Sequence, residues 1–322
     1  MELTGGASGR ECPGGRAAFG CRRYDGADDE ANGKERRMIE ITTSNVNGIR
    51  AARRKGIETW AVGHAPDVWC MQEVRAPQSE VDPIFDSIAA DYAQAGRIDS
   101  PAALDRLNEV CRIKGRAGVG LLSALPIVEK RYGLPGLEED VDSGRWIEAD
   151  VRTPQGYVIT VACVYVHAGQ AEDEVKMTQK YRFLDTMRKR LAQLRDEAAG
   201  GGRQAVLCGD FNIAHTELDI ARPKQNVDHS GFLPQERAYV DTWLDEFEFV
   251  DVVRDLAGDI QGPYTWWSQR GRAFDNNVGW RIDYQFATPE LAQQARGFVI
   301  DKAPSYDARW SDHAPLTVSY DV

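Results

Sequence analysis

Apolar residues recur along the chain in short runs that are typical of buried β-strands. Each run is rich in Val, Ile, Leu or aromatic residues and ends at polar or turn-forming residues. The predicted strands cover residues 38–43, 67–72, 118–125, 145–151, 157–166, 205–210, 282–288 and 315–320. Because helical patterns lie between many of these runs, the sequence predicts an α/β protein.

The clearest helix is predicted over residues 174–198, where apolar residues recur at steps of three and four positions. The stripe comprises Met177, Tyr181, Leu184, Met187, Leu191 and Leu194. Such a stripe indicates a face packed on the core. Further helices are predicted over residues 49–63, 82–94 and 235–247, an inserted helix or loop over 97–117, and a long connection over 211–234. Long connections in compact domains are often functional.

The first 37 residues differ from the rest of the chain. Residues 1–37 are rich in Gly, Ala, Arg and Asp and show no apolar periodicity, so we predict a disordered tail. The remaining residues, 38–322, are expected to form one catalytic domain. Acidic and basic residues balance within the tail, so the net charge of -11 belongs to the predicted domain.

Composition narrows the class of protein. With 322 residues, 42% of them hydrophobic, the chain can bury a large core. No apolar run is long enough to span a membrane, and the first residues lack the apolar segment of a secretory signal. Cys70, Cys163 and Cys208 lie in apolar runs, as free cysteines do, which favours a reducing cytoplasm. The negative charge argues mildly against nucleic acid, although a local basic stripe is compatible with it.

Polar side chains lie at one end of six of the predicted strands, either just after the strand or at its start. Each alone can be read as a turn or a cap, but ligand sites of α/β folds collect at strand ends. The residues are Asn45 and Asn47, Glu73, Tyr165 and His167, Asp210 and Asn212, Asp283, and Asp312 with His313. Six such strand ends in one chain predict a shared site.

The order of these residues resembles the exonuclease III family of apurinic/apyrimidinic endonucleases, within the endonuclease/exonuclease/phosphatase superfamily. The set "QE…GDFN…SDH" is shared across the superfamily, whereas "GFLPQERA" (231–238), "YTWW" (264–267) and "NNVGWRIDY" (276–284) resemble its DNA-repair branch. The resemblance covers residues 38–322. It implies a four-layer α/β sandwich of two packed mixed β-sheets flanked by helices, and phosphodiester hydrolysis that depends on Mg²⁺ or Mn²⁺.

The resemblance also implies a role for each polar residue. Glu73 would be the main metal ligand, with Asn47 and Asp312 beside it. Carboxylate and amide oxygens suit Mg²⁺. Asp210 and Asn212 would hold the attacking water. His313 would face the phosphate, and Asp283 would orient the histidine ring. Asn45 and Tyr165 would form hydrogen bonds with the phosphate. Whether Asp210 or His313 takes the proton from the water is left open by the sequence.

One stretch departs from the family pattern. Much of the family has Tyr-x-Pro-Asn-Gly where this chain has "YVHAG", so His167 is either a phosphate or substrate contact or a structural histidine. The resemblance also implies that Trp266, Trp280 and Ile282 wall an apolar pocket. For the tryptophans the alternative is core packing, above all for Trp267. The expected contacts to the DNA backbone are Arg222, Lys224, Arg237, Arg270, Arg272 and Arg281.

Three functions compete. The first is a monomeric DNA-repair nuclease that cuts 5′ to an abasic site in duplex DNA and can also act on blocked 3′ ends as exonuclease and 3′-phosphatase. The second is a superfamily phosphatase acting on a small phosphate or a lipid. The third is a DNA-binding scaffold without catalysis, which predicts a missing ligand or base, yet every superfamily position is filled.

Overall fold

The structure is a computed structural model that describes residues 38–138 and 140–322. The predicted disordered tail, residues 1–37, lies outside the described residues. The division of the chain into a tail and one catalytic domain therefore stays a prediction.

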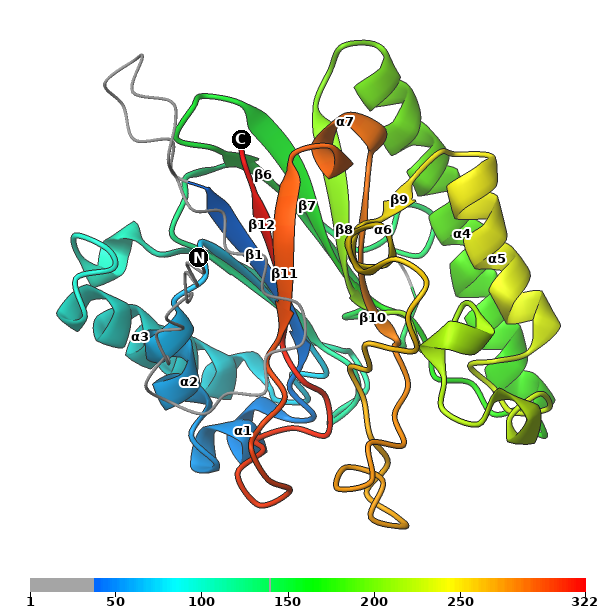
Figure 1. Cartoon of the computed structure of the whole chain (residues 1–322). Coiled ribbons are helices and arrows are strands. Elements are labelled where there is room, and N and C mark those ends of the chain that lie inside the picture. The colour runs from blue at the N-terminus through cyan, green and yellow to red at the C-terminus, as the bar shows by residue number, and fades with distance from the viewer. Residues whose placement is uncertain (1–37, 139) are drawn as a thin grey trace, which may run out of the picture.

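Two mixed β-sheets of six strands each form the centre of the described chain (Figure 1). In the order in which its strands pair, the first sheet contains β11 (Ala295–Ile300), β12 (Leu316–Tyr320), β1 (Ile39–Asn45), β2 (Val68–Gln72), β4 (Val119–Ser123) and β3 (Asp105–Glu109). The second contains β5 (Ile127–Tyr132), β6 (Trp146–Arg152), β7 (Val158–Tyr165), β8 (Gln204–Asp210), β10 (Asp283–Ala287) and β9 (Val250–Asp251). The pairs β1–β2 and β7–β8 are parallel, and the other pairs are antiparallel.

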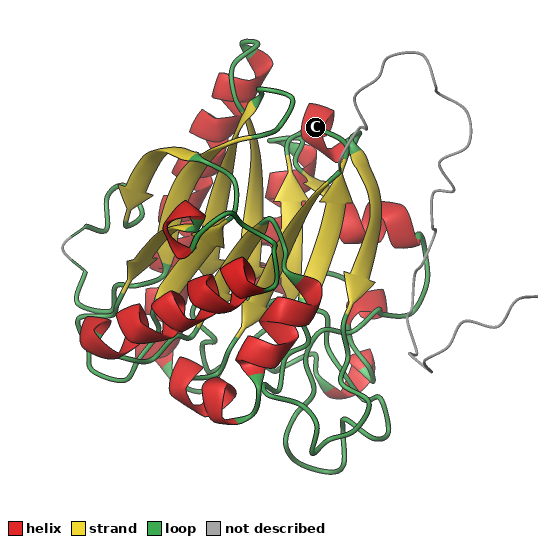
Figure 2. Cartoon of the chain, turned by 90° about the vertical axis from the view of Figure 1, so that its left-hand side faces the viewer, coloured by secondary structure: helices red, strands yellow, loops and turns green. Residues whose placement is uncertain are grey.

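Helices cover the outer face of each sheet. The first sheet packs against α1 (Ile49–Arg54), α2 (Ile57–His64) and α3 (Gln78–Gln94), and the second against α4 (Glu174–Ala199) and α5 (Pro234–Asp245). Figure 2, viewed from the side of α1–α3, shows these helices lying across the strands. Two short helices, α6 (Val252–Ala257) and α7 (Pro289–Ala292), and single 3₁₀ turns at Pro101–Ala103, Glu217–Asp219 and Pro223–Gln225 complete the described elements.

Alternate residues of the inner strands pack into different layers of the core. In β2, Cys70 packs between the two sheets, whereas Trp69 packs against the α1–α3 layer. In β8, Cys208 faces the other sheet, whereas Leu207 packs against α4 and α5. Both faces of these strands are buried, which explains why their sequences are continuous apolar runs. The expected four-layer α/β sandwich is confirmed.

The helical stripe predicted over 174–198 corresponds to α4. Asp173 accepts a hydrogen bond from the backbone amide of Lys176 and so caps the helix. The prediction of a single helix over residues 49–63 was wrong. It divides into α1 and α2 at Gly56, whose φ of 93° is left-handed.

The segment 97–117 is neither a simple helix nor a simple loop, because it contains a 3₁₀ turn and strand β3. Cys70, Cys163 and Cys208 are free and buried, as expected. None of the helices among the described residues combines the length and apolar character needed to cross a bilayer.

Candidate active site

The register of the strands places the polar strand ends side by side. Asp210, at the end of β8, lies opposite Tyr165 of β7 on one side and Asp283 of β10 on the other. In the first sheet, Asn45 ends β1 opposite Gln72 of β2, directly before Glu73. The long loops before β10 and β12 extend from this same end of the molecule (Figure 1).

A cavity of about 480 Å³ opens at this end of the sheets. The predicted residues that line it are Asn47, Glu73, Asp210, Asn212, Trp266, Trp280, Ile282, Asp312 and His313. Lining residues that the sequence analysis did not single out include Arg75, Gln170 and His229. Asn45, Tyr165 and Asp283 do not line the cavity, but each is hydrogen-bonded to a residue that does.

His313 is paired with Asp283 and not with its neighbour in sequence, Asp312. The Nδ1 atom of His313 lies 2.8 Å from Oδ2 of Asp283, and its Nε2 atom lies 3.9 Å from Oδ2 of Asp210. Burial alone would lower the pKa of His313, but the carboxylates of Asp283 and Asp210 raise that pKa to about 10. Both ring nitrogens therefore hold a proton at neutral pH.

Asp210 is fully buried and held by two asparagines. Its Oδ2 accepts hydrogen bonds from Nδ2 of Asn45 at 2.8 Å and from Nδ2 of Asn212 at 3.2 Å. Its Oδ1 accepts the backbone amide of Asn212 at 2.9 Å. Burial raises the pKa of Asp210 to about 7. A carboxylate with that pKa can take up a proton at neutral pH.

A second group of oxygen atoms lies around Arg75. Its Nη2 is 2.5 Å from Oε2 of Glu73, and its Nη1 donates to Oδ1 of Asn47 at 2.8 Å. Nδ2 of Asn47 donates to Oδ1 of Asp312 at 2.8 Å. The hydroxyl of Tyr165 donates to the other oxygen of Glu73.

The backbone at these positions is unusual for residues with side chains. Asn47, Glu73, Arg75 and Asn212 all have positive φ angles, between 46° and 54°. Residues other than glycine adopt this conformation at some energetic cost, and such positions cluster at functional sites. The sharp turns after β1, β2 and β8 aim these side chains into the cavity region.

Two sets of residues could hold a metal ion. Ligand atoms of Asp210, Asp283 and His313 lie within 4.8 Å of one another. However, a doubly protonated imidazole has no lone pair to offer a cation. Glu73, Asn47 and Asp312 offer only oxygen ligands and line the cavity, and a cationic guanidinium already contacts the first two. The chemistry of this second set fits a hard divalent cation.

The aromatic wall of the cavity comes from the segment before β10. The rings of Trp266 and Trp280 meet edge to face with centroids 6.0 Å apart, and both residues are partly exposed. Ile282 packs in the same small cluster. Trp267 instead is buried in the main core, so for this residue the core alternative holds.

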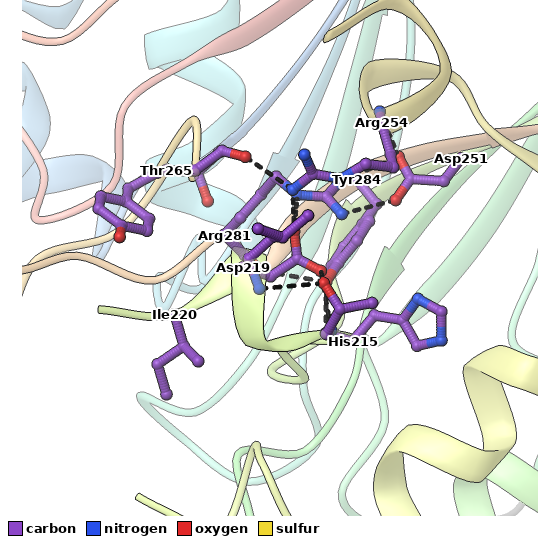
Figure 3. Close-up of polar contacts among 12 residues, drawn as sticks. His215, Asp219, Ile220, Asp251, Arg254, Thr265, Arg281 and Tyr284 are labelled. Carbon is purple, nitrogen blue, oxygen red and sulfur yellow. Dashed lines mark hydrogen bonds and ion pairs between the residues drawn. The ribbon is translucent and has the colours of Figure 1, made fainter. Parts of the chain in front are cut away.

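Arg281 does not contact the cavity, and its predicted contact with substrate and the DNA backbone was wrong. Its guanidinium is buried, with Nε 2.7 Å from Oδ1 of Asp219 and Nη2 2.7 Å from Oδ2 of Asp251 (Figure 3). Asp219 also accepts from Arg254 at 2.5 Å. The network joins the 211–234 segment, which contains Asp219, to the segment before β10, which contains Trp280 and Arg281. The backbone amide of Arg281 also donates to the backbone carbonyl of Asp219. Of the other proposed backbone contacts, Arg237 is partly buried, while Arg222, Lys224, Arg270 and Arg272 are exposed.

His167 lies outside the main cavity. It is buried, with Nδ1 3.5 Å from Oδ2 of Asp142. Burial and the neighbouring Arg145 lower the pKa of His167 to about 3, so the ring is neutral. It lines a second cavity, beside Tyr165.

A buried lysine supports the site from α4. Nζ of Lys180 lies 2.6 Å from Oε1 of Glu236 and 2.9 Å from the backbone carbonyl of Asn212. Both charged side chains are fully buried. The sequence analysis missed Lys180, although its place between Met177 and Leu184 on the apolar stripe was a signal, since a charge at a core position needs a buried partner.

Comparison with known proteins identifies a family for this chain. The model of the Endonuclease/Exonuclease/phosphatase family matches residues 42–313. An exodeoxyribonuclease of Bacillus subtilis is 29% identical over 287 residues, covering 88% of this chain and 100% of the relative. The DNA repair nuclease APEX1 of Danio rerio is 29% identical over 300 residues, covering 92% and 87%.

Solved structures have the same overall fold. An AP endonuclease from Archaeoglobus fulgidus superposes with a TM-score of 0.72 at 28% identity, covering 88% of this chain and 100% of that one. A 3′ phosphatase from Neisseria, bound to a product DNA hairpin, superposes with a TM-score of 0.73 at 25% identity, with the same coverage of both chains. The chain belongs to the Endonuclease/Exonuclease/phosphatase family. Within it, the resemblance to the exonuclease III family of AP endonucleases is confirmed.

Proposed function

We propose that this protein is a DNA-repair nuclease that hydrolyses the phosphodiester 5′ to an abasic site in duplex DNA. The same site would act on blocked 3′ ends as 3′-to-5′ exonuclease and 3′-phosphatase. One observation is the main support: the paired His313 and Asp283, the buried Asp210 and the oxygen set around Glu73 meet at one cavity walled by tryptophans. The enzyme is a hydrolase of the exonuclease III and AP endonuclease type.

Residues of the first sheet would hold the metal ion. Glu73 and Asp312, with Asn47 between them, would bind Mg²⁺ or Mn²⁺ through their oxygen atoms. When bound, the cation neutralises charge on the phosphate and on the leaving oxygen. Tyr165 would keep Glu73 in place, because its hydroxyl bonds a carboxylate oxygen of that residue.

Residues of the second sheet would activate the water and bind the phosphate. Asp210 is the proposed general base, because its raised pKa lets it accept a proton, whereas His313 is already protonated. Asn45 and Asn212 would aim its carboxylate at the water. The Nε2–H of His313 would donate to a phosphate oxygen and stabilise the charge that develops there. Asp283 would maintain this orientation through Nδ1.

Selection of an abasic site would be steric. A sugar without a base can turn into the cavity beside Trp266, Trp280 and Ile282. A normal nucleotide must first unpair, at a cost of a few kcal/mol, and its base would then meet these walls. The names of the relatives, which include AP endonucleases, favour this substrate over a small phosphate ester. A monomeric state and a cytoplasmic location stay predictions.

The proposal can be tested with a labelled duplex that has a single abasic site. We expect cleavage at that site in Mg²⁺ and none in EDTA. Glu73→Gln should lower the rate by orders of magnitude with an unchanged fold, and extra Mg²⁺ should restore part of the rate. Failure to cleave this duplex, combined with turnover of inositol phosphates, would favour the phosphatase alternative instead. Wild-type activity of Glu73→Gln at micromolar metal would remove Glu73 from the metal site.

A further inference from the structure

Trp266 connects the tryptophan wall of the active-site cavity to the dipeptide of Asp312 and His313. On one side, its backbone amide and carbonyl exchange hydrogen bonds of 2.9 Å with the carbonyl and amide of Trp280. On the other side, Trp266 forms a β-bridge with His313, and the amide of the next residue, Trp267, donates to the carbonyl of Asp312 at 3.2 Å. The backbone therefore fixes Trp266 relative to the wall and to the dipeptide at once.

The side chain of Trp266 makes a contact that an apolar wall does not need. Its indole Nε1 donates a hydrogen bond of 3.3 Å to Oδ2 of Asp312. An indole N–H can only donate, so the carboxylate oxygen is the acceptor. The ring also meets Trp280 edge to face, and its centroid lies 6.4 Å from that of the His313 ring. One ring thus belongs both to the apolar wall and to the charged side of the cavity.

The two carboxylate oxygens of Asp312 have different donors. Nδ2 of Asn47 donates to Oδ1 at 2.8 Å, and Trp266 donates to Oδ2. The terminal torsion of an aspartate is otherwise broad, so donors on both oxygens narrow the range of orientations. A carboxylate oxygen has more than one lone-pair site, so Oδ2 can accept from the indole and still bind a cation. The indole N–H therefore orients Asp312 without occupying it.

The orientation of Asp312 is important in this chain because Asn47 is uncharged. Of the three residues in the proposed metal set, Glu73 and Asp312 supply carboxylates and Asn47 supplies an amide oxygen. The guanidinium of Arg75 already contacts Glu73 and Asn47. With two carboxylates in the set, metal affinity depends strongly on how Asp312 is aimed. Hydrogen-bond partners of ligating side chains typically contribute about 10- to 100-fold to metal affinity or activity.

We propose that Trp266 is a positioning residue for the metal ligand Asp312, in addition to its place in the wall of the sugar pocket. This inference rests on the proposed function, because it takes Asp312 as a ligand of the bound cation. The observation that carries it is the indole N–H, whose acceptor is the carboxylate. A phenylalanine at this position would preserve much of the apolar wall and would lack the donor. Trp266 therefore contributes to metal binding before any DNA is present.

The test measures Mn²⁺ binding by the full-length chain without DNA, by isothermal titration calorimetry. Trp266→Phe removes the N–H together with part of the ring. A second variant has the benzothienyl analogue of tryptophan at position 266, in which sulfur replaces the N–H at nearly the same shape. Trp280→Phe is the matched control, because it makes the same change in the same wall, at a ring that packs on Trp266. Urea unfolding of each variant monitors the fold.

We expect both changes at position 266 to weaken Mn²⁺ binding about tenfold, with an unchanged urea midpoint. Trp280→Phe should bind Mn²⁺ as the wild type does. On an abasic duplex, the benzothienyl variant should need a higher Mg²⁺ concentration for half of its maximal rate. Its KM for DNA at saturating Mg²⁺ should equal that of the wild type, because the wall keeps its shape. A purely structural role of Trp266 would instead lower the urea midpoint or raise the KM for DNA.

Two results would overturn the inference and leave the proposed function intact. The first is a wild type that cleaves the abasic duplex while both variants at position 266 bind Mn²⁺ with wild-type affinity. The second is weaker Mn²⁺ binding by Trp266→Phe that the benzothienyl variant does not share, or that Trp280→Phe shares in full, since packing of the wall would then be the cause. A wild type that neither binds Mn²⁺ nor cleaves the abasic duplex would overturn both the inference and the proposed function.

Discussion

Asp219→Asn tests whether the buried network behind the tryptophans holds the substrate pocket in shape. Oδ1 of Asp219 accepts from Arg281 at 2.7 Å and from Arg254 at 2.5 Å. Oδ2 accepts the backbone amide and the hydroxyl of Thr216, both at 2.9 Å. An asparagine that keeps its oxygen toward the arginines turns its NH₂ group toward the backbone amide of Thr216. Both groups are hydrogen-bond donors, so no hydrogen bond can form between them. The variant therefore loses a charge and the hydrogen bond from the Thr216 amide, whereas the Thr216 hydroxyl can accept from the new NH₂ group.

The magnitude follows from burial and charge. Asp219 is fully buried, and burial alone would raise its pKa, yet Arg281 and Arg254 lower that pKa to about 2. Relative to an ordinary aspartate, this shift corresponds to about 2 to 3 kcal/mol in favour of the charged folded form. The substitution also leaves Arg281 with only Asp251 as a carboxylate partner. Breaking a buried pair from one side costs about 3 to 5 kcal/mol, a large part of a typical total stability.

The sign of the pH dependence is also defined. Because the pKa of Asp219 is lowered in the folded state, its contribution is present above the unfolded pKa of about 4 and is lost as the pH falls toward 2. Urea unfolding at neutral pH should show Asp219→Asn less stable by about 3 to 5 kcal/mol. The difference from the wild type should narrow by about 2 kcal/mol as the pH falls from about 5 toward 2.

The matched control is Glu246→Gln, which breaks an exposed ion pair with Arg188. This change should cost less than about 1 kcal/mol at any pH. A loss below about 1 kcal/mol for Asp219→Asn at neutral pH would refute the reasoning, because the network would then contribute no more than an exposed pair. A difference that does not vary with pH would show that the charge on Asp219 is not what stabilises the fold.

Three further predictions concern the proposed activity. Asp283→Asn should affect kcat more than KM on an abasic duplex. Because Asp283 and His313 act as a unit, the double variant with His313→Asn should lose less activity than the product of the two single losses. A double variant whose loss of activity equals that product would contradict this. Trp280→Ala should lower the ratio of kcat/KM on abasic duplex to kcat/KM on intact duplex, with metal binding unchanged. A ratio equal to that of the wild type would place abasic recognition elsewhere. A chain that starts at Met38 should cleave at the full-length rate and unfold at the same urea concentration, and a large drop in either would show that the tail docks.

The apolar pattern of the sequence predicted the interior of both sheets. All eight predicted strands exist, and they are the strands with a neighbour on each side. Most positions of these strands are buried, so each sequence contains an apolar run that can be detected. The four strands that the pattern did not predict, β3, β5, β9 and β11, are the outer edges of the two sheets. An edge strand such as β5, with the sequence "IVEKRY", is mostly exposed and has no apolar run to detect.

The polar strand ends likewise predicted which residues meet at the cavity, because the ends of neighbouring strands lie close together in any sheet. Their hydrogen-bond partners depend on register and on the turns that follow. The sequence could not distinguish Arg281, a buried structural residue, from the exposed arginines near it, since a guanidinium has the same chemistry in both places. Nor could it predict the second cavity, whose lining residues come from segments far apart in the chain. Residue type and local period determined the elements and their polar ends. Only the packing of distant segments decided which charges are paired with one another and which line a cavity.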